Sequence, residues 1–169
     1  MTLALLLAAT AAQLPSSPSL GVAEGRCRAN ESGPAILVDV AGLKDRQGLL
    51  KLEAYPSNDQ DFLADDNVLI MAGKVFRRVA GPVPARGNVQ LCIRVPAPGA
   101  YSLSLLHDRD SNRRFGLSVD GAGFPNNPRL GLSRPRAAAT RVVAGQGITR
   151  IRIVMNYRRG MFSFGPLER

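Results

Sequence analysis

Hydrophobic and polar residues alternate with a period of two along most of the chain, a pattern typical of strands with one buried face. The clearest run is 87–95, where Val89, Leu91 and Ile93 alternate with more polar neighbours. Gly and Pro clusters separate the runs, as turns between strands would require. The pattern predicts strands at 36–40, 50–54, 73–79, 87–95, 101–105 and 150–157, of which 73–79 is the weakest.

Strands spaced in this way predict an all-β fold, an antiparallel Greek-key-type β-sandwich of about seven strands. One short helical turn is expected at 59–67, in a crossover loop. The chain has 169 residues and is 45% hydrophobic, which is enough for one well-buried core. Its 17 Gly and 12 Pro residues exclude a helix bundle or a coiled coil.

The first residues carry an apolar run, 3–12, that ends in small side chains. It is too short to span a bilayer and is typical of a secretory signal, although no basic residue precedes it. A frayed apolar start of a cytosolic protein is the alternative. No later segment approaches transmembrane length, so we expect a periplasmic or secreted protein that is not transmembrane. The predicted organisation is a signal peptide (1–12), a leader segment (13–34), a sandwich domain (35–157) and a C-terminal tail (158–169).

Two cysteines, Cys27 and Cys92, are the only thiols in the chain. They are too few for a zinc site built on cysteines, and they are not a CxxC pair. Alternation places Cys92 on the polar face of its strand, where half of a disulfide is more plausible than core filling. We therefore expect a Cys27–Cys92 disulfide, with two unrelated thiols as the alternative.

Charge is distributed unevenly along the chain. Residues 1–72 carry five basic and nine acidic side chains, whereas residues 73–169 carry seventeen basic and four acidic ones. The arginines are scattered, and no aromatic residues are interleaved with them as a nucleic-acid stacking surface would need. Solvated strand faces explain most of this charge, and no nucleic-acid partner is expected. Attraction to an anionic envelope surface is an alternative.

The stretch 108–135 lacks alternation, and long irregular loops in compact domains are usually functional or specially stabilised. Asp108, Asp110 and Asn112 place three oxygen side chains at alternate positions, as in the first half of many calcium loops. The rest of an EF-hand is missing, so Asp120 could supply a late ligand only if the loop folds back. No cofactor is expected, with calcium as an alternative. Otherwise, these side chains cap turns and pair with neighbouring arginines.

His107 is the only histidine, and its position on the inward face of a strand predicts a ring at the edge of the core. A hydrogen bond to the long loop is the simplest role for it. A His–Asp pair could serve acid–base catalysis, which makes a hydrolase using His107 and a carboxylate a further alternative. No GxSxG or HExxH motif accompanies it, so we expect no enzymatic activity.

The segments PGAYSLSLLHDRDSN (98–112) and GLSVDGAGFPNN (116–127) resemble the secreted bacterial proteins grouped as domain of unknown function 2141, over residues 35–157. The resemblance implies a small transthyretin-like or carboxypeptidase-regulatory-like β-sandwich and no known activity. Asp120 stands where the family has Glu, and Pro125 where it usually has Ser. The residues that match the family pattern are Gly99, Tyr101, His107, Asp108, Asp110, Asn112, Gly116, Gly121, Gly123, Phe124, Asn126 and Asn127.

Together these observations predict an exported, non-catalytic β-sandwich that acts as a binding or envelope-associated module. Its interaction surface would be the 108–128 loop, and its partner an unidentified protein or envelope component. A calcium-stabilised form of the same module is the first alternative.

Overall fold

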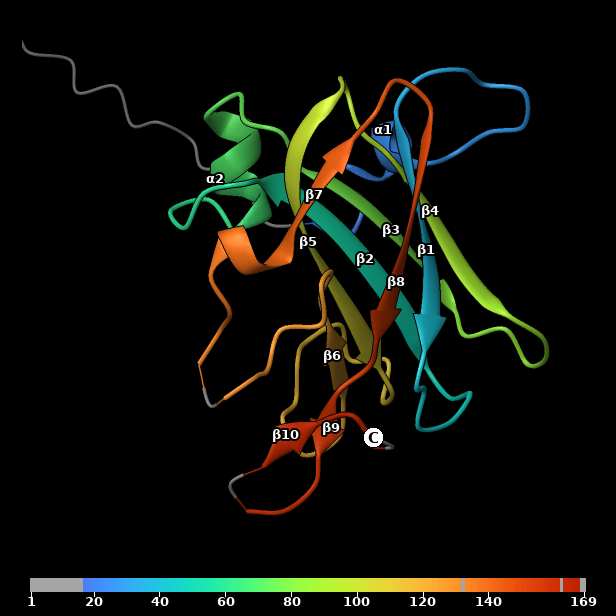
Figure 1. Ribbon diagram of the computed structural model, residues 1–169, viewed down its shortest axis with the longest axis vertical. Coiled ribbons are helices and arrows are strands. Elements are labelled where there is room, and N and C mark those ends of the chain that lie inside the picture. The colour runs from blue at the N-terminus through green and yellow to red at the C-terminus, as the bar shows by residue number, and fades with distance from the viewer. Residues whose placement is uncertain (1–16, 132, 162, 168–169) are drawn as a thin grey trace, which may run out of the picture.

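The structure is a computed structural model that describes residues 17–131, 133–161 and 163–167. The predicted signal peptide, 1–12, lies outside the described residues. Within them, ten strands form two packed sheets and a small hairpin, with two short α-helices and one 3-10 turn (Figure 1). The all-β prediction is therefore confirmed. None of the helices in the described residues is long and apolar enough to cross a membrane.

One sheet has three strands in the order β4-β1-β8, and the other has five. In the five-stranded sheet the order is β3-β2-β5, and β6 and β7 both pair with the free edge of β5. The hairpin of β9 and β10 lies with β6 at one end of the molecule (Figure 1). The strands are β1 (Ala35–Ala41), β2 (Leu49–Pro56), β3 (Arg77–Pro82), β4 (Val89–Arg94), β5 (Gly99–Asp108), β6 (Gly121–Gly123), β7 (Arg141–Ala144), β8 (Ile148–Val154), β9 (Tyr157–Arg158) and β10 (Phe164–Gly165).

Alternation along the strands produces the core between the sheets, because every second side chain points to the same face. Ile36, Leu52, Leu103, Ile153 and Met155 lie in this core and are almost completely buried. All five belong to inward-facing series that the sequence pattern predicts.

One pair of strands differs in relative direction from the prediction. β8 runs parallel to β1, whereas the sequence predicts an antiparallel sandwich. The chain reaches β8 from β7, which belongs to the other sheet, so β8 enters beside β1 by a connection between sheets rather than by a hairpin within one. Hydrophobic alternation is the same for both directions and cannot distinguish them.

A second core covers part of the outer face of the five-stranded sheet. Tyr55, Phe62, Phe76 and Phe124 pack there edge to face, with α2 (Asp66–Met71) above them. Phe76 thus precedes β3 instead of belonging to it, and the strand expected at 73–79 begins at Arg77. The helical turn expected at 59–67 is a hydrogen-bonded turn followed by α2, a few residues later than predicted.

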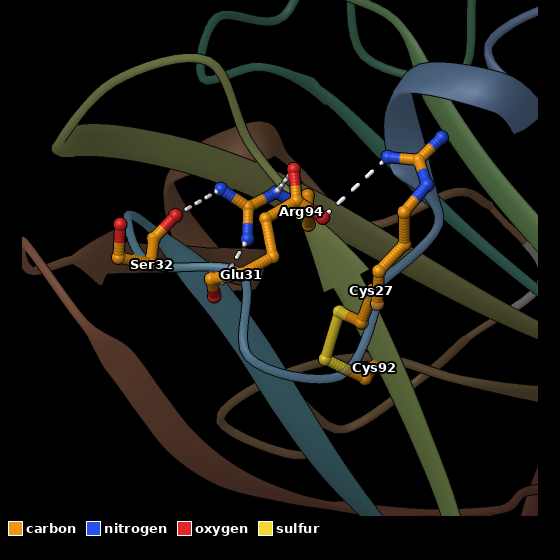
Figure 2. The surroundings of a disulfide bond; sticks show 6 residues. Cys27, Glu31, Ser32, Cys92 and Arg94 are labelled. Carbon is orange, nitrogen blue, oxygen red and sulfur yellow. Dashed lines mark hydrogen bonds and ion pairs between the residues drawn. A yellow bond between two sulfur atoms is a disulfide. The ribbon is translucent and has the colours of Figure 1, made fainter.

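Residues 17–34 pack against the sheets. They contain α1 (Val22–Gly25), and the predicted disulfide is present, joining Cys27 to Cys92 of β4. Figure 2 shows Arg94 beside this disulfide, with its guanidinium reaching Glu31 and the carbonyl of Ser32. The segment expected to be a leader is therefore fastened to both sheets, because Arg78 of β3 donates to the carbonyls of Ser17 and Gly21 and the disulfide reaches β4.

Candidate functional site

Two buried carboxylates shape the first half of the long loop. Asp108 accepts hydrogen bonds from the backbone N–H groups of Asn112 (3.1 Å) and Arg113 (2.8 Å). Asp120 accepts from the N–H groups of Arg109 (2.8 Å) and Gly116 (2.7 Å). These bonds satisfy loop amides that the strands do not pair. The loop folds back, as a late Asp120 ligand would require.

The same fold brings three of the four predicted metal-ligating residues together. Oxygen atoms of Asp108, Asp110 and Asp120 lie within 4.8 Å of one another. Burial raises the pKa of Asp108, the N–H group of Arg113 lowers it, and the neighbouring Asp110 and Asp120 raise it again. Carboxylates gathered in this way suit a hard cation such as calcium.

Asn112, the fourth predicted ligand, is turned toward the loop itself. Its Oδ1 accepts from the N–H of Arg114 at 2.7 Å, and its Nδ2 donates to Asp110 at 2.8 Å. The side chain therefore performs the turn-capping role that was the alternative to metal binding. A cation here would be coordinated by the three carboxylates.

His107 is completely buried, and both of its ring nitrogens are engaged. Nε2 lies 2.8 Å from the carbonyl oxygen of Gln47, so it carries the proton, and the hydroxyl of Tyr157 donates to Nδ1 at 2.6 Å. These partners replace the long loop that the sequence suggests. Burial lowers the pKa of His107 and raises the pKa of Tyr157 to about 12.

The GFPNN segment fastens the loop to its surroundings. Asn126 donates to the carbonyls of Ala139 and Arg141, and Asn127 accepts from the N–H of Val154. Both asparagines have left-handed backbone angles, with φ of 61° and 46°, which Asn tolerates better than most residues. Their side-chain amides therefore satisfy backbone groups of neighbouring segments.

Glycine and aromatic residues of the family pattern also have structural positions. A Cβ on Gly123 would lie 2.5 Å from Cγ2 of Ile153, so only glycine fits this close approach. Phe124 is in the second core. Tyr101 donates its hydroxyl to the carbonyl of Ala97 at 2.8 Å, which fastens the strand start to the preceding loop.

An apolar groove lies between the long loop and the outer face of the five-stranded sheet, beyond the second core. Its volume is about 330 Å³, in the range of small-molecule sites. Phe115 and Leu117 are 50% and 44% exposed on the loop side, and Phe115 contacts Phe164 of β10 edge to face. This hollow is called here the apolar groove. Its main apolar walls are Leu106, Phe115, Leu117, Phe124, Leu130 and Phe164.

A polar hollow of about 540 Å³ adjoins the groove and shares Lys51, Glu53 and Leu63 with it. Its floor is an almost buried ion network in which Arg78 contacts Glu53 (2.7 Å) and Asp66 (3.0 Å). Burial opposes the charge of Arg78, but the two carboxylates raise its pKa overall. Buried charges need such pairing, and the network fixes the position of Glu53 beside the groove.

Sequence reasoning missed both the apolar groove and the ion network. A signal for the network was present, because Lys51 and Glu53 occupy the polar positions of a predicted strand and Arg77-Arg78 lies in the next one. Register pairs Glu53 with Arg78, which alternation alone cannot show. The groove has no periodic signal, since Phe115 and Leu117 lie in an irregular loop.

No curated protein and no solved structure matches the chain. Residues 38–152 match the family described as "Uncharacterized protein conserved in bacteria (DUF2141)". The matched region runs from β1 to β8 and includes the whole loop between β5 and β7. The chain therefore belongs to this bacterial family, DUF2141.

Proposed function

We propose that the protein is an exported, non-catalytic binding module of the bacterial envelope, and that the 108–128 loop builds its ligand-binding surface. The observation that carries this proposal is the apolar groove. Two large apolar side chains of the loop, Phe115 and Leu117, stand half-exposed over a hollow in the sheet. Burying them against a ligand would release a substantial hydrophobic free energy.

The chemistry of His107 supports a binding role over a hydrolytic one. A general base needs access to the proton that it removes. The imidazole has no exposed surface, and Tyr157 and Gln47 occupy both of its nitrogens. The polar groups of the described site instead hold the loop in one conformation.

Export is supported by the disulfide and by the predicted signal. Disulfides persist mainly in oxidising compartments such as the periplasm, so the Cys27–Cys92 bond is compatible with that location.

The proposal is tested with N-phenyl-1-naphthylamine, a neutral dye whose fluorescence rises in apolar surroundings. We expect the purified protein to bind it and Leu117→Ser to weaken binding about tenfold, because one buried leucine contributes roughly 1.5–3 kcal/mol. Val143→Ser is the matched control, since Val143 is 70% exposed on β7, away from the groove. Equal binding by both variants, or none by the parent protein, would contradict the proposal.

A calcium-stabilised module is a second candidate, favoured by the carboxylates of Asp108, Asp110 and Asp120. Burial raises the pKa of Asp108, as do the neighbouring Asp110 and Asp120, and a cation there would favour the charged form of all three carboxylates. Calcium at 100 times its dissociation constant would add about 2.7 kcal/mol of stability. For a domain of this size, the melting temperature would rise by roughly 5–10 °C over its value in EDTA.

The thermal melt is repeated with Asp110→Asn, which removes the exposed carboxylate of the three. Asp65→Asn is the matched control, an exposed aspartate outside the cluster. A calcium-dependent rise that Asp110→Asn abolishes and Asp65→Asn retains is the expected result. The absence of any rise in the parent protein would leave these carboxylates with their turn-capping role alone.

A further inference from the structure

We propose that the ligand of the apolar groove is a single-chain amphiphile with an anionic head, of the class of medium-chain fatty acids. The inference rests on the proposed function, because it names the ligand of the same groove. It depends on two properties of the groove: the length of chain that its volume holds, and the sign of the charge at its rim.

The volume suits a chain of about ten carbons. A methylene group is similar in size to a water molecule, which occupies about 30 Å³ in the liquid. The groove of about 330 Å³ therefore holds roughly ten such groups. Its walls are apolar side chains from β5, the loop and β10, so they match a hydrocarbon chain along its length.

The rim carries one cation that has no carboxylate partner among the described residues. Arg134 is exposed at the rim, and its guanidinium donates to the carbonyls of Phe62 (3.1 Å) and Asp59 (3.5 Å). These bonds hold the guanidinium of Arg134 in place and use only part of its five N–H donors. A guanidinium oriented in this way is suited to a carboxylate.

The other charges of the groove compensate each other. Glu53 is the only acidic residue in the described lining, and it contacts both Arg78 (2.7 Å) and Lys51 (3.4 Å). The adjoining polar hollow is lined by four basic and four acidic side chains, so it favours neither sign. The uncompensated charge beside the groove is thus the positive charge of Arg134, which places the anionic head at that end.

The test measures displacement of N-phenyl-1-naphthylamine by decanoate and by decan-1-ol, two probes of equal chain length that differ in head-group charge. At low ionic strength, we expect decanoate to compete about tenfold better than decan-1-ol. Added salt should reduce this preference, because the guanidinium lies at an exposed rim.

Three variants test whether Arg134 causes the preference for decanoate over decan-1-ol. Arg134→Gln should weaken decanoate binding about tenfold and leave decan-1-ol unchanged, and Arg134→Lys should retain part of the preference. Arg136→Gln is the matched control, an exposed arginine two positions along that does not line the groove. It should behave like the parent protein.

The outcomes separate this inference from the proposed function. Dye binding with equal competition by decanoate and decan-1-ol would overturn the anionic ligand and retain the binding module. Equal weakening of both probes by Arg134→Gln would show that the residue only supports the 130–137 segment, which also overturns the inference. Failure of the dye to bind the parent protein would overturn the proposed function itself.

Discussion

The imidazole of His107 connects two parts of the chain that lie far apart in sequence. It accepts a hydrogen bond from Tyr157 in β9 and donates one to Gln47 in the turn before β2. The hydroxyl of Tyr157 also accepts from the N–H of Lys44 at 3.1 Å. The neutral ring therefore satisfies both the hydroxyl of Tyr157 and the carbonyl of Gln47. Protonation of the ring would remove the acceptor that Tyr157 uses.

This arrangement predicts that acidification destabilises the protein through His107. Its pKa in the folded state lies below 6.5, so the unfolded chain takes up the proton first as the pH falls. The stabilising contribution is complete above about pH 6.5 and is lost as the pH falls through the lowered value. We expect the free energy of unfolding in urea to decrease between about pH 7.5 and about pH 5.

His107→Gln serves as the comparison, because it removes the titrating ring and retains the charges near it, Asp45, Arg109 and Asp120. The variant should be less stable at neutral pH but should lose less stability on acidification. The raised pKa of Asp108 acts in the opposite direction at lower pH and is common to both proteins. The same decrease in both would show that another group causes the effect.

At the residue scale, the sequence predicts positions better than partners. Its alternation places His107 inward, and the oxygen side chains after it are expected to cap turns, as Asn112 does. The partners of His107 come from β9 and from the turn before β2, and nothing local in the sequence specifies them. Long-range contacts of this kind depend on register and on the packing of distant segments.

Among the elements, β6 fixes the position of the long loop on the five-stranded sheet. Its three residues pair with β5 on one side, and a bridge joins Ala122 to Asn156. Gly121 lies against the ring of Tyr157, where a Cβ would come within 2.3 Å of Cε1. The short strand thus fits only because it lacks side chains at its two ends.

Gly121→Ala is therefore expected to lower the free energy of unfolding by about 1–3 kcal/mol, the usual cost of overpacking a tight contact. Gly81→Ala provides the matched control, since Gly81 also lies in a strand and a Cβ there meets nothing within 4 Å. Its effect should stay within about 0.5 kcal/mol. Urea unfolding measures both effects. Equal stability of the two variants would contradict the close packing of Gly121 against Tyr157.

The elements that the sequence predicts are those with several alternating residues, such as β1, β2, β4 and β5. β6, β9 and β10 have three residues or fewer, which is too short for a periodic signal. The sequence does not predict the second core, because Phe62 and Phe124 lie outside the alternating runs and Phe76 lies in the weakest of them. Their burial follows from α2 and the loop covering the outer face of a sheet, which is a tertiary effect.

For the molecule as a whole, the fold leaves an apolar groove between the long loop and one sheet face. The second core and α2 close the outer face of the five-stranded sheet at one end, and the long loop extends over the rest. The disulfide and Arg94 hold residues 27–34 against the other sheet (Figure 2). The apolar groove lies on the other side of the molecule's core, on the five-stranded sheet, between β5, the long loop and β10.

The most direct test of the central claim is to map decanoate binding by chemical-shift changes in a two-dimensional ¹H–¹⁵N spectrum of the protein. If decanoate binds in the apolar groove, the changes are concentrated at the amides of residues 104–106, 115–124, 130–131 and 133–134, with none on β1, β4 and β8. Changes on the three-stranded sheet, or no changes at all at saturating decanoate, would contradict the assignment of the groove as the binding surface.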